Sequence, residues 1–265
     1  MESENQTEWQ APPPPEKITV EQPEMSELAT LGNIFLEPGR TFEDLKKKPR
    51  FLIAGIIISL MVTAFAFGIA YKVGDEGMRS FIQQQMDKNP QVASMSAEQK
   101  ASAINMQMTI SSFVRYALPV IVLIGLAIGG LFYWLGAKAF GGTGNFLHGL
   151  SVWIYSMFPP TVVSMVANYI ILFFKSADDI DLANSQRGVV PSNLGFLFGP
   201  ETSAVLVTLI SVLDLFAIWG WVLAAIGLRI TNRLSSGSAW AIVLIFALVG
   251  VTFRVIGAYF SGNPS

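Results

Sequence analysis

Residues 51–71 have the sequence FLIAGIIISLMVTAFAFGIAY, in which no side chain carries a charge. About 20 apolar residues in an α-helix, rising roughly 1.5 Å each, match a hydrocarbon layer about 30 Å thick. Residues 239–253 form a second uncharged stretch. Only 14% of the 265 residues are charged, whereas a soluble chain usually has about 25%. The sequence therefore predicts an integral membrane protein.

Five such stretches predict an all-α, polytopic helix bundle that forms one membrane domain over residues 51–260. The chain has no cysteine, which excludes disulfides and thiolate-ligated metals. The first apolar stretch begins only after a long acidic leader, so we expect a retained anchor rather than a cleaved signal peptide. The expected spans are residues 51–71, 113–135, 149–174, 204–228 and 239–260.

Two segments are expected outside these spans. Residues 1–27 are acidic and proline-rich with few apolar side chains, a composition that predicts a disordered tail. Residues 72–112 predict a helical external loop that Pro90 divides. Within this loop, Ser96 through Gln99 fits a capping box, and we expect the helix that it opens to continue into the second span.

Residues 28–50 predict an amphipathic elbow on the membrane surface. Apolar side chains recur there at helical spacing, Pro38–Gly39 divides the pattern, and a capped helix start is expected at Thr41. Anionic headgroups attract basic residues, so we expect lipids or a partner protein to contact the basic cluster that follows. The same cluster would also orient the first span. Its members are Lys46, Lys47, Lys48 and Arg50.

Basic residues also predict the orientation in the membrane. Arg40 and the four residues of the basic cluster lie just before the first span, and the loops after spans two and four carry Lys138, Arg229 and Arg233, whereas the loop after span three is acidic. Loops rich in lysine and arginine stay in the cytoplasm. We therefore expect the N-terminus in the cytoplasm and the C-terminus outside, in the inner (plasma) membrane.

Polar groups inside the expected spans are the candidates for chemistry. A carboxylate near the bilayer centre costs at least a few kcal/mol unless it is paired, so Asp214 in span four is expected to pair with Arg254 in span five. The pair would either hold the two spans together or take part in a proton or ion relay. Pro159 and Pro160 are expected to kink or break the third span because two backbone donors are missing. The freed carbonyls would bind either a substrate or neighbouring helices.

No catalytic residue, cofactor or metal site is predicted. His148 is the single histidine, too few ligands for an ordinary zinc site. A structural or interfacial role is expected for it, and a Ser–His pair without a nucleophile elbow is the open alternative. The glycines of Gly141–Gly144 lack the Gly-Lys-Ser/Thr ending of a phosphate loop, and a tight turn explains them better.

Partners are predicted only by class. No basic patch with interleaved aromatic residues indicates nucleic-acid binding. Small residues at four-residue spacing, such as Gly125 with Gly129, let helices approach closely within a bundle and permit a homo-oligomer.

Several short stretches carry a family resemblance. Residues 34–45, IFLEPGRTFEDL, precede a basic run, Pro49 and the five expected spans. Three further stretches are Trp134–Lys138, Tyr155–Pro159 and Trp219–Trp221. Over roughly residues 28–260 the chain resembles the Yip (Ypt/Rab-interacting protein) family, and specifically its bacterial branch.

This resemblance implies a multi-pass protein with a cytoplasmic N-terminus and, in eukaryotic relatives, binding of small GTPases and partner membrane proteins during vesicle traffic. The Asp-Leu-Tyr-Gly-Pro motif typical of eukaryotic members is absent, and Glu37-Pro38-Gly39 stands in its region. We therefore expect a non-enzymatic interaction or scaffold component whose partner is a membrane protein. The alternative is a small-solute or ion transporter that uses Asp214, Arg254 and the proline-broken third span.

Overall fold

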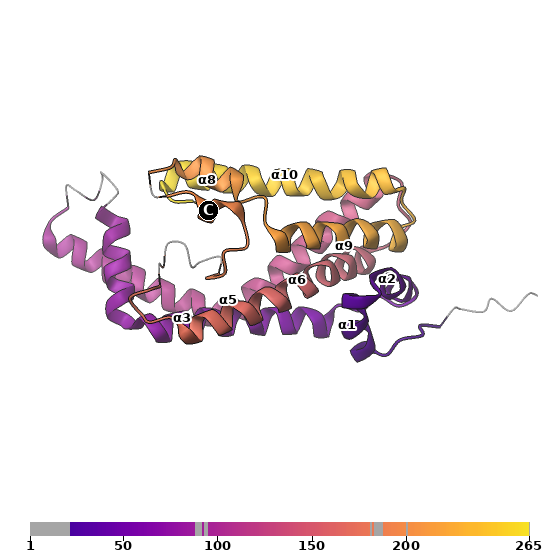
Figure 1. Ribbon diagram of the computed structural model, residues 1–265, viewed down its shortest axis with the longest axis horizontal. Helices are drawn as coiled ribbons and strands as arrows, with labels where there is room; N and C mark the ends of the chain where they lie inside the picture. Colours follow the sequence, from indigo (N-terminus) through magenta and orange to yellow (C-terminus); the bar gives the residue numbers. More distant parts are fainter. Residues whose placement is uncertain are drawn as a thin grey trace, which may run out of the picture.

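The computed structural model describes residues 22–87, 92, 95–180, 182, 188–199 and 201–264. Pro90 and most of the predicted tail lie outside these residues. The named elements are all helices, and the long ones run side by side along the long axis of the molecule (Figure 1). Four are long and apolar enough to cross a membrane: α3 (Leu52–Asp87), α5 (Ala97–Ala139), α6 (Phe146–Phe174) and α10 (Ser236–Ser261). The predicted all-α membrane bundle is confirmed.

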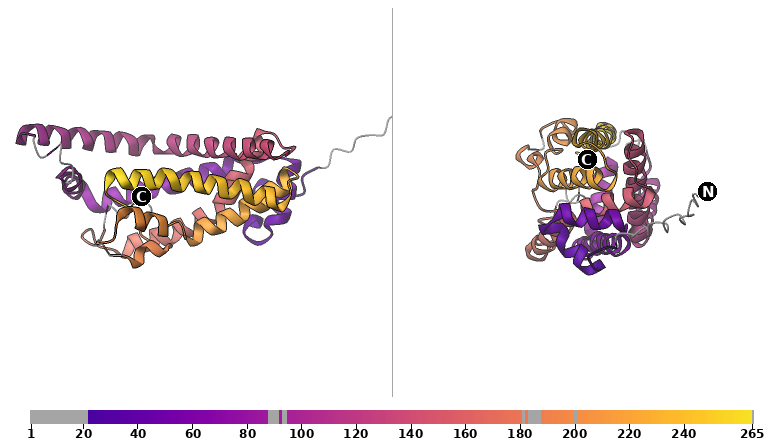
Figure 2. Two further views of the ribbon diagram at one scale, coloured as in Figure 1. Left: turned by 90° about the horizontal axis from the view of Figure 1, so that it is seen from above. Right: turned by 90° about the vertical axis from the view of Figure 1, so that its right-hand side faces the viewer.

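The shorter elements lie at the two ends of the bundle. Helices α1 (Glu27–Leu36) and α2 (Pro38–Lys47) form the elbow, and they pack where α6 begins and α9 (Leu215–Thr231) ends (Figures 1 and 2). We call this the elbow end and the opposite one the far end. The far end carries the 3₁₀ helix η1 (Leu194–Leu197) and the short helix α8 (Ala204–Ile210).

The fourth expected span, residues 204–228, is divided into two helices. Both α8 and α9 pack on α10, and the helix stops between them at residues 211–214. Within a membrane, free backbone groups need partners inside the protein. The loop before η1 supplies one, because the Leu215 N–H donates to the Ser192 carbonyl at 3.0 Å. The expectation of one continuous helix here was wrong.

The third expected span is not broken at its double proline. Helix α6 continues from Phe146 to Phe174 with Pro159 and Pro160 inside it, so the predicted helix break was wrong. Proline has no N–H to donate to the carbonyl four residues earlier in a helix. Pro160 therefore leaves the Ser156 carbonyl without its helical hydrogen bond. Helix α9 covers this carbonyl closely, since a Cβ built at Gly220 would lie only 3.5 Å from the Ser156 oxygen. Neighbouring helices let membrane helices tolerate proline in this way.

Helices α3 and α5 continue far past the bilayer thickness at the far end. The 43 residues of α5 span about 65 Å at the helical rise, roughly twice the hydrocarbon layer. Helix α3 turns at Gly74, whose φ of 71° favours glycine. The capping box that opens α5 is confirmed: Ser96 Oγ accepts from the Gln99 N–H at 3.2 Å, and Gln99 Oε1 accepts from the Ser96 N–H at 2.9 Å.

Candidate functional site: the elbow and the polar groups of the bundle

The elbow is two helices joined at a proline, and the first of them has a side-chain cap. Ser26 caps α1 by accepting from the Ala29 N–H at 3.1 Å. Helix α2 begins at Pro38, three residues before the start expected at Thr41. Proline suits the first position of a helix because its missing N–H would have no partner there. The Thr41 hydroxyl instead donates back to the Glu37 carbonyl at 3.0 Å.

The apolar face of the elbow is buried against the bundle. Ile34, Phe42 and Leu45 have no exposed surface and belong to the same core cluster as residues of α6 and α9. Phe42 lies against a glycine of α9, and a Cβ added at Gly227 would come within 2.8 Å of its ring. The bundle therefore buries the apolar face of the elbow, which was expected to lie on the membrane surface.

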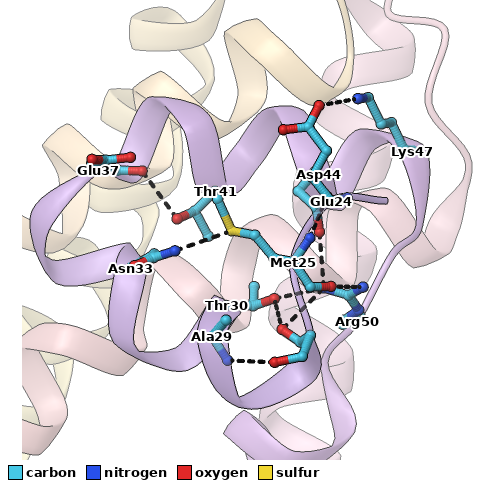
Figure 3. A network of polar contacts seen from close by, with 11 residues as sticks. Glu24, Met25, Ala29, Thr30, Asn33, Glu37, Thr41, Asp44, Lys47 and Arg50 are labelled. Carbon is cyan, nitrogen blue, oxygen red and sulfur yellow. Dashed lines mark hydrogen bonds and ion pairs between the residues drawn. The ribbon is translucent and has the colours of Figure 1, made fainter. Parts of the chain in front are cut away.

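A buried ion pair holds the elbow together (Figure 3). Arg50 Nη1 lies 2.9 Å from Asp44 Oδ2, and the two side chains are only 9% and 3% exposed. The guanidinium also donates to the Thr30 hydroxyl and the Met25 carbonyl, both at 2.6 Å. Asp44 Oδ1 accepts from the backbone N–H groups of Glu24 at 2.5 Å and Met25 at 3.2 Å. The arrangement supplies the hydrogen bonds that a buried charge pair needs, so Arg50 is a structural residue.

Two lysines of the basic cluster face acidic partners. Lys46 Nζ lies 3.5 Å from Glu43, Lys47 Nζ lies 3.1 Å from Glu24, and Lys48 is exposed. The hydrogen bond and charge of Lys47, followed by the charge of Arg40, lower the pKa of the Glu24 carboxyl below its ordinary value. Residues 22–50 contain five basic and five acidic side chains, so their formal charge is zero. The acids are Glu24, Glu27, Glu37, Glu43 and Asp44, and the bases are Arg40, Lys46, Lys47, Lys48 and Arg50.

His148 ties the elbow to α6. Its Nδ1 accepts from the Asn145 N–H at 3.2 Å, and Nε2 lies 3.1 Å from the Lys46 carbonyl, near the end of α2. Nδ1 also lies 2.7 Å from the Asn145 Oδ1, and in the tautomer with the proton on Nε2, this nitrogen donates to the Lys46 carbonyl. These contacts support the structural role expected for His148. The neighbouring Gly141–Gly144 segment forms a tight turn, with φ of 81° at Gly141.

Asp214 caps α9 at the break in the fourth span. Its Oδ1 accepts from the Ala217 N–H at 2.9 Å, and its other carboxylate oxygen accepts from the Ser192 hydroxyl. Among the salt bridges between described residues, none joins Asp214 to Arg254, which lies in α10. The charge interpreted as one half of an intramembrane ion pair therefore serves as a helix cap.

Asp214→Ala is expected to destabilise the protein by about 1 kcal/mol, because the cap is lost, whereas Asp214→Asn is expected to be nearly neutral because asparagine caps as well as aspartate. An essential ion pair would make both variants costly. Thermal unfolding of the purified variants in mild detergent distinguishes the capping role from an essential ion pair. Equal losses in both variants would contradict the capping role.

Sequence reasoning missed two parts of this arrangement. Asp44 follows Glu43 just after the helix start expected at Thr41, and nothing in the local pattern separates the buried carboxylate of Asp44 from the exposed one of Glu43. Asn168 on α6 holds the loop at the far end, because its Oδ1 accepts from the N–H groups of Val189 at 2.5 Å and Val190 at 3.1 Å. In the part of the chain that the structure describes, no cluster of histidine and acidic residues could hold a metal ion.

Part of the elbow's apolar surface stays uncovered. Leu28 is 75% exposed and Leu36 is 83% exposed. Gly32 lies between them at four-residue spacing and is exposed as well. Residues four apart share one face of a helix. Helix α1 therefore buries one side in the bundle and presents a second, partly apolar side outward.

The helix bundle and its elbow define a multi-pass membrane protein. The sequence matches the Yip1 domain family over residues 32–257, and the chain belongs to this family. It is 26% identical over 244 residues to "Membrane protein YknW" of Bacillus subtilis (strain 168), a match that covers 89% of this chain and 91% of the relative. No solved structure matches the chain. The family resemblance found in the sequence is confirmed.

Proposed function

We propose that this protein is a non-enzymatic scaffold whose elbow, on the cytoplasmic side of the inner membrane, binds a partner membrane protein through the outer face of α1. The observation that carries the proposal is the exposure of Leu28 and Leu36 on a helix whose other side is anchored in the core. A face held rigidly before binding loses little conformational entropy on association. Such a surface suits a stable protein interface.

Charge favours a protein over a lipid surface as the occupant of this face. Attraction to anionic headgroups grows with each uncompensated basic residue near the membrane. The elbow has formal charge zero over residues 22–50, and Lys46 and Lys47 already contact carboxylates. Lipid contact through the basic cluster therefore has weaker support than a protein partner has.

The transporter alternative loses two of the features that motivated it. Helix α6 has no break at Pro159 and Pro160, and the Asp214 carboxylate is occupied as a cap. A homo-oligomer remains compatible with the exposed face, because a second copy could supply the partner surface.

Leu28→Glu combined with Leu36→Glu is expected to reduce recovery of the partner at least about tenfold when the tagged protein is isolated from membranes in mild detergent, since two buried apolar anchors are together worth more than about 1.4 kcal/mol. A photoreactive residue at position 28 or 36 should crosslink to the same partner. Leu248 on α10, which is 66% exposed and outside the elbow, is the control position for the photoreactive residue and should not crosslink to this partner.

The control variant Lys46→Gln, Lys47→Gln and Lys48→Gln separates the protein from the lipid interpretation. A protein partner held by Leu28 and Leu36 should be retained by this triple variant. If photoreactive residues on α1 crosslink only to lipid, and the triple variant releases the elbow from anionic nanodiscs, the scaffold proposal is wrong and the elbow is a lipid-binding element. Crosslinks between two copies of the chain would identify the partner as a homo-oligomer.

A further inference from the structure

A cavity of about 310 Å³, partly open at the surface of the bundle, lies between α5, α6, α9 and α10. Ser156 and Ala247, on opposite walls, are ten and eleven residues from the elbow-end starts of α6 and α10. At the helical rise these positions are about 15 and 17 Å deep, close to the middle of a hydrocarbon layer about 30 Å thick. A ligand for this cavity must therefore be soluble in the membrane.

The cavity wall is mostly apolar with several aromatic side chains, and its two serine hydroxyls are already used. Ser156 Oγ donates to the Trp153 carbonyl at 2.9 Å, and Ser164 Oγ donates to the Thr161 carbonyl at 3.1 Å. Bonded back to their own helix, they offer little to water. A polar solute or a file of water would find few partners here, since a stable buried water needs two to four of them.

Two polar groups in this wall, on Tyr133 and Trp153, are not bonded in this way. Tyr133 is only 3% exposed and lines the cavity, and no hydrogen bond between described residues uses its hydroxyl. The indole Nε1 of Trp153 is likewise buried without a hydrogen-bond partner among the described residues. The Tyr133 ring is fixed by Trp153, edge-on at 4.9 Å between centroids, and by Phe246 at 6.0 Å. Buried tyrosine hydroxyls usually find a partner. An acceptor on a ligand would satisfy this one.

We propose that the cavity binds a membrane-soluble ligand with an apolar body and at least one carbonyl oxygen, which accepts a hydrogen bond from Tyr133. Isoprenoid quinones and acyl esters share this chemistry. A planar quinone ring would also find aromatic neighbours in Trp153 and Phe246. The site is independent of the elbow surface proposed above.

The test uses the full chain in nanodiscs and a short-chain isoprenoid quinone as probe. Quinones quench tryptophan fluorescence, and Trp153 and Trp221 line the cavity. Saturable quenching is expected in the wild type. Tyr133→Phe should weaken binding about tenfold, the change expected from losing a hydrogen bond worth about 1.4 kcal/mol. Tyr259→Phe, at an exposed tyrosine of α10, should leave affinity unchanged.

A second pair of variants tests the cavity itself. A Cβ added at Gly220, which lines the cavity, would meet its nearest neighbours at ordinary contact distances of 3.5 and 3.7 Å, and Gly220→Leu adds further side-chain volume there. It should abolish saturable quenching. Gly250→Leu on α10, where no atom lies within 4 Å of an added Cβ, should not. Thermal unfolding shows that each variant is folded.

Competition separates the two ligand sources. Displacement of the quinone by a fatty-acid methyl ester, with the same dependence on Tyr133, would assign the site to acyl esters. Equal affinity of wild type and Tyr133→Phe would overturn the proposal. So would full reaction of Ala247→Cys with a membrane-impermeant maleimide, because it would show that the cavity is open to water; the chain has no other cysteine.

Discussion

Asp44→Ala is expected to destabilise the folded elbow by about 3–5 kcal/mol, because it leaves the Arg50 guanidinium buried without its carboxylate. The same change removes the acceptor of two backbone N–H groups, those of Glu24 and Met25. The effect should be local, since the ion pair joins parts of the elbow to one another. Hydrogen exchange of the protein in mild detergent should show faster exchange in α1 and α2, with α5 and α6 unchanged.

Two further variants test the cause of this loss. Glu43→Ala removes an exposed partner of Lys46 from the neighbouring position, and such surface pairs are worth less than about 1 kcal/mol. Asp44→Ala combined with Arg50→Met removes the stranded charge and should recover much of the protection. If Asp44→Ala loosened the elbow no more than Glu43→Ala does, the buried pair would not be what holds it.

This variant also connects stability with the proposed function. The elbow surface around Leu28 and Leu36 is proposed to bind while it is held in place. Asp44→Ala should therefore lower partner recovery even though both leucines are intact, and the double variant with Arg50→Met should restore it. Recovery that is insensitive to Asp44→Ala would mean that α1 alone suffices for binding.

Hydropathy predicted the membrane helices well, because the length of an apolar helix is dictated by the thickness of the bilayer. The local rules that place helix breaks at proline failed, because contacts with neighbouring helices determine where these helices end. Pro159 and Pro160 sit in an unbroken helix because α9 covers the Ser156 carbonyl at Gly220. The break at residues 211–214 contains neither proline nor glycine, and its one signal was Asp214, a favourable helix cap.

The elbow shows a second limit of sequence patterns. Its periodicity predicted two helices with an apolar face, but the same amphipathic face fits a headgroup layer or a protein surface. Only the arrangement of α6 and α9 around Phe42 distinguishes the two. Burial of Asp44 beside an exposed Glu43 is likewise set by the approach of Arg50, six residues later.

The crossing of α5 and α6 depends on two glycines that face each other. A Cβ built at Gly130 would lie 2.6 Å from the Leu150 Cα, and one built at Gly149 would lie 2.8 Å from the Gly130 carbonyl oxygen. Both obstacles are backbone atoms, which cannot move aside as a flexible side chain can. Small residues allow such close approach between membrane helices, whose association depends on packing rather than on the hydrophobic effect.

Gly130→Ala and Gly149→Ala are each expected to destabilise the bundle by about 3 kcal/mol, the upper part of the range for overpacking, because the two helices must separate. Gly125→Ala is the matched control on the same helix, since no atom lies within 4 Å of its Cβ position. It should cost nothing, because alanine is the better helix former. Thermal unfolding in detergent should therefore separate Gly125→Ala from the other two. Equal behaviour of all three would mean that α5 and α6 are held apart in the membrane, with their contact supplied by lipid or by another chain.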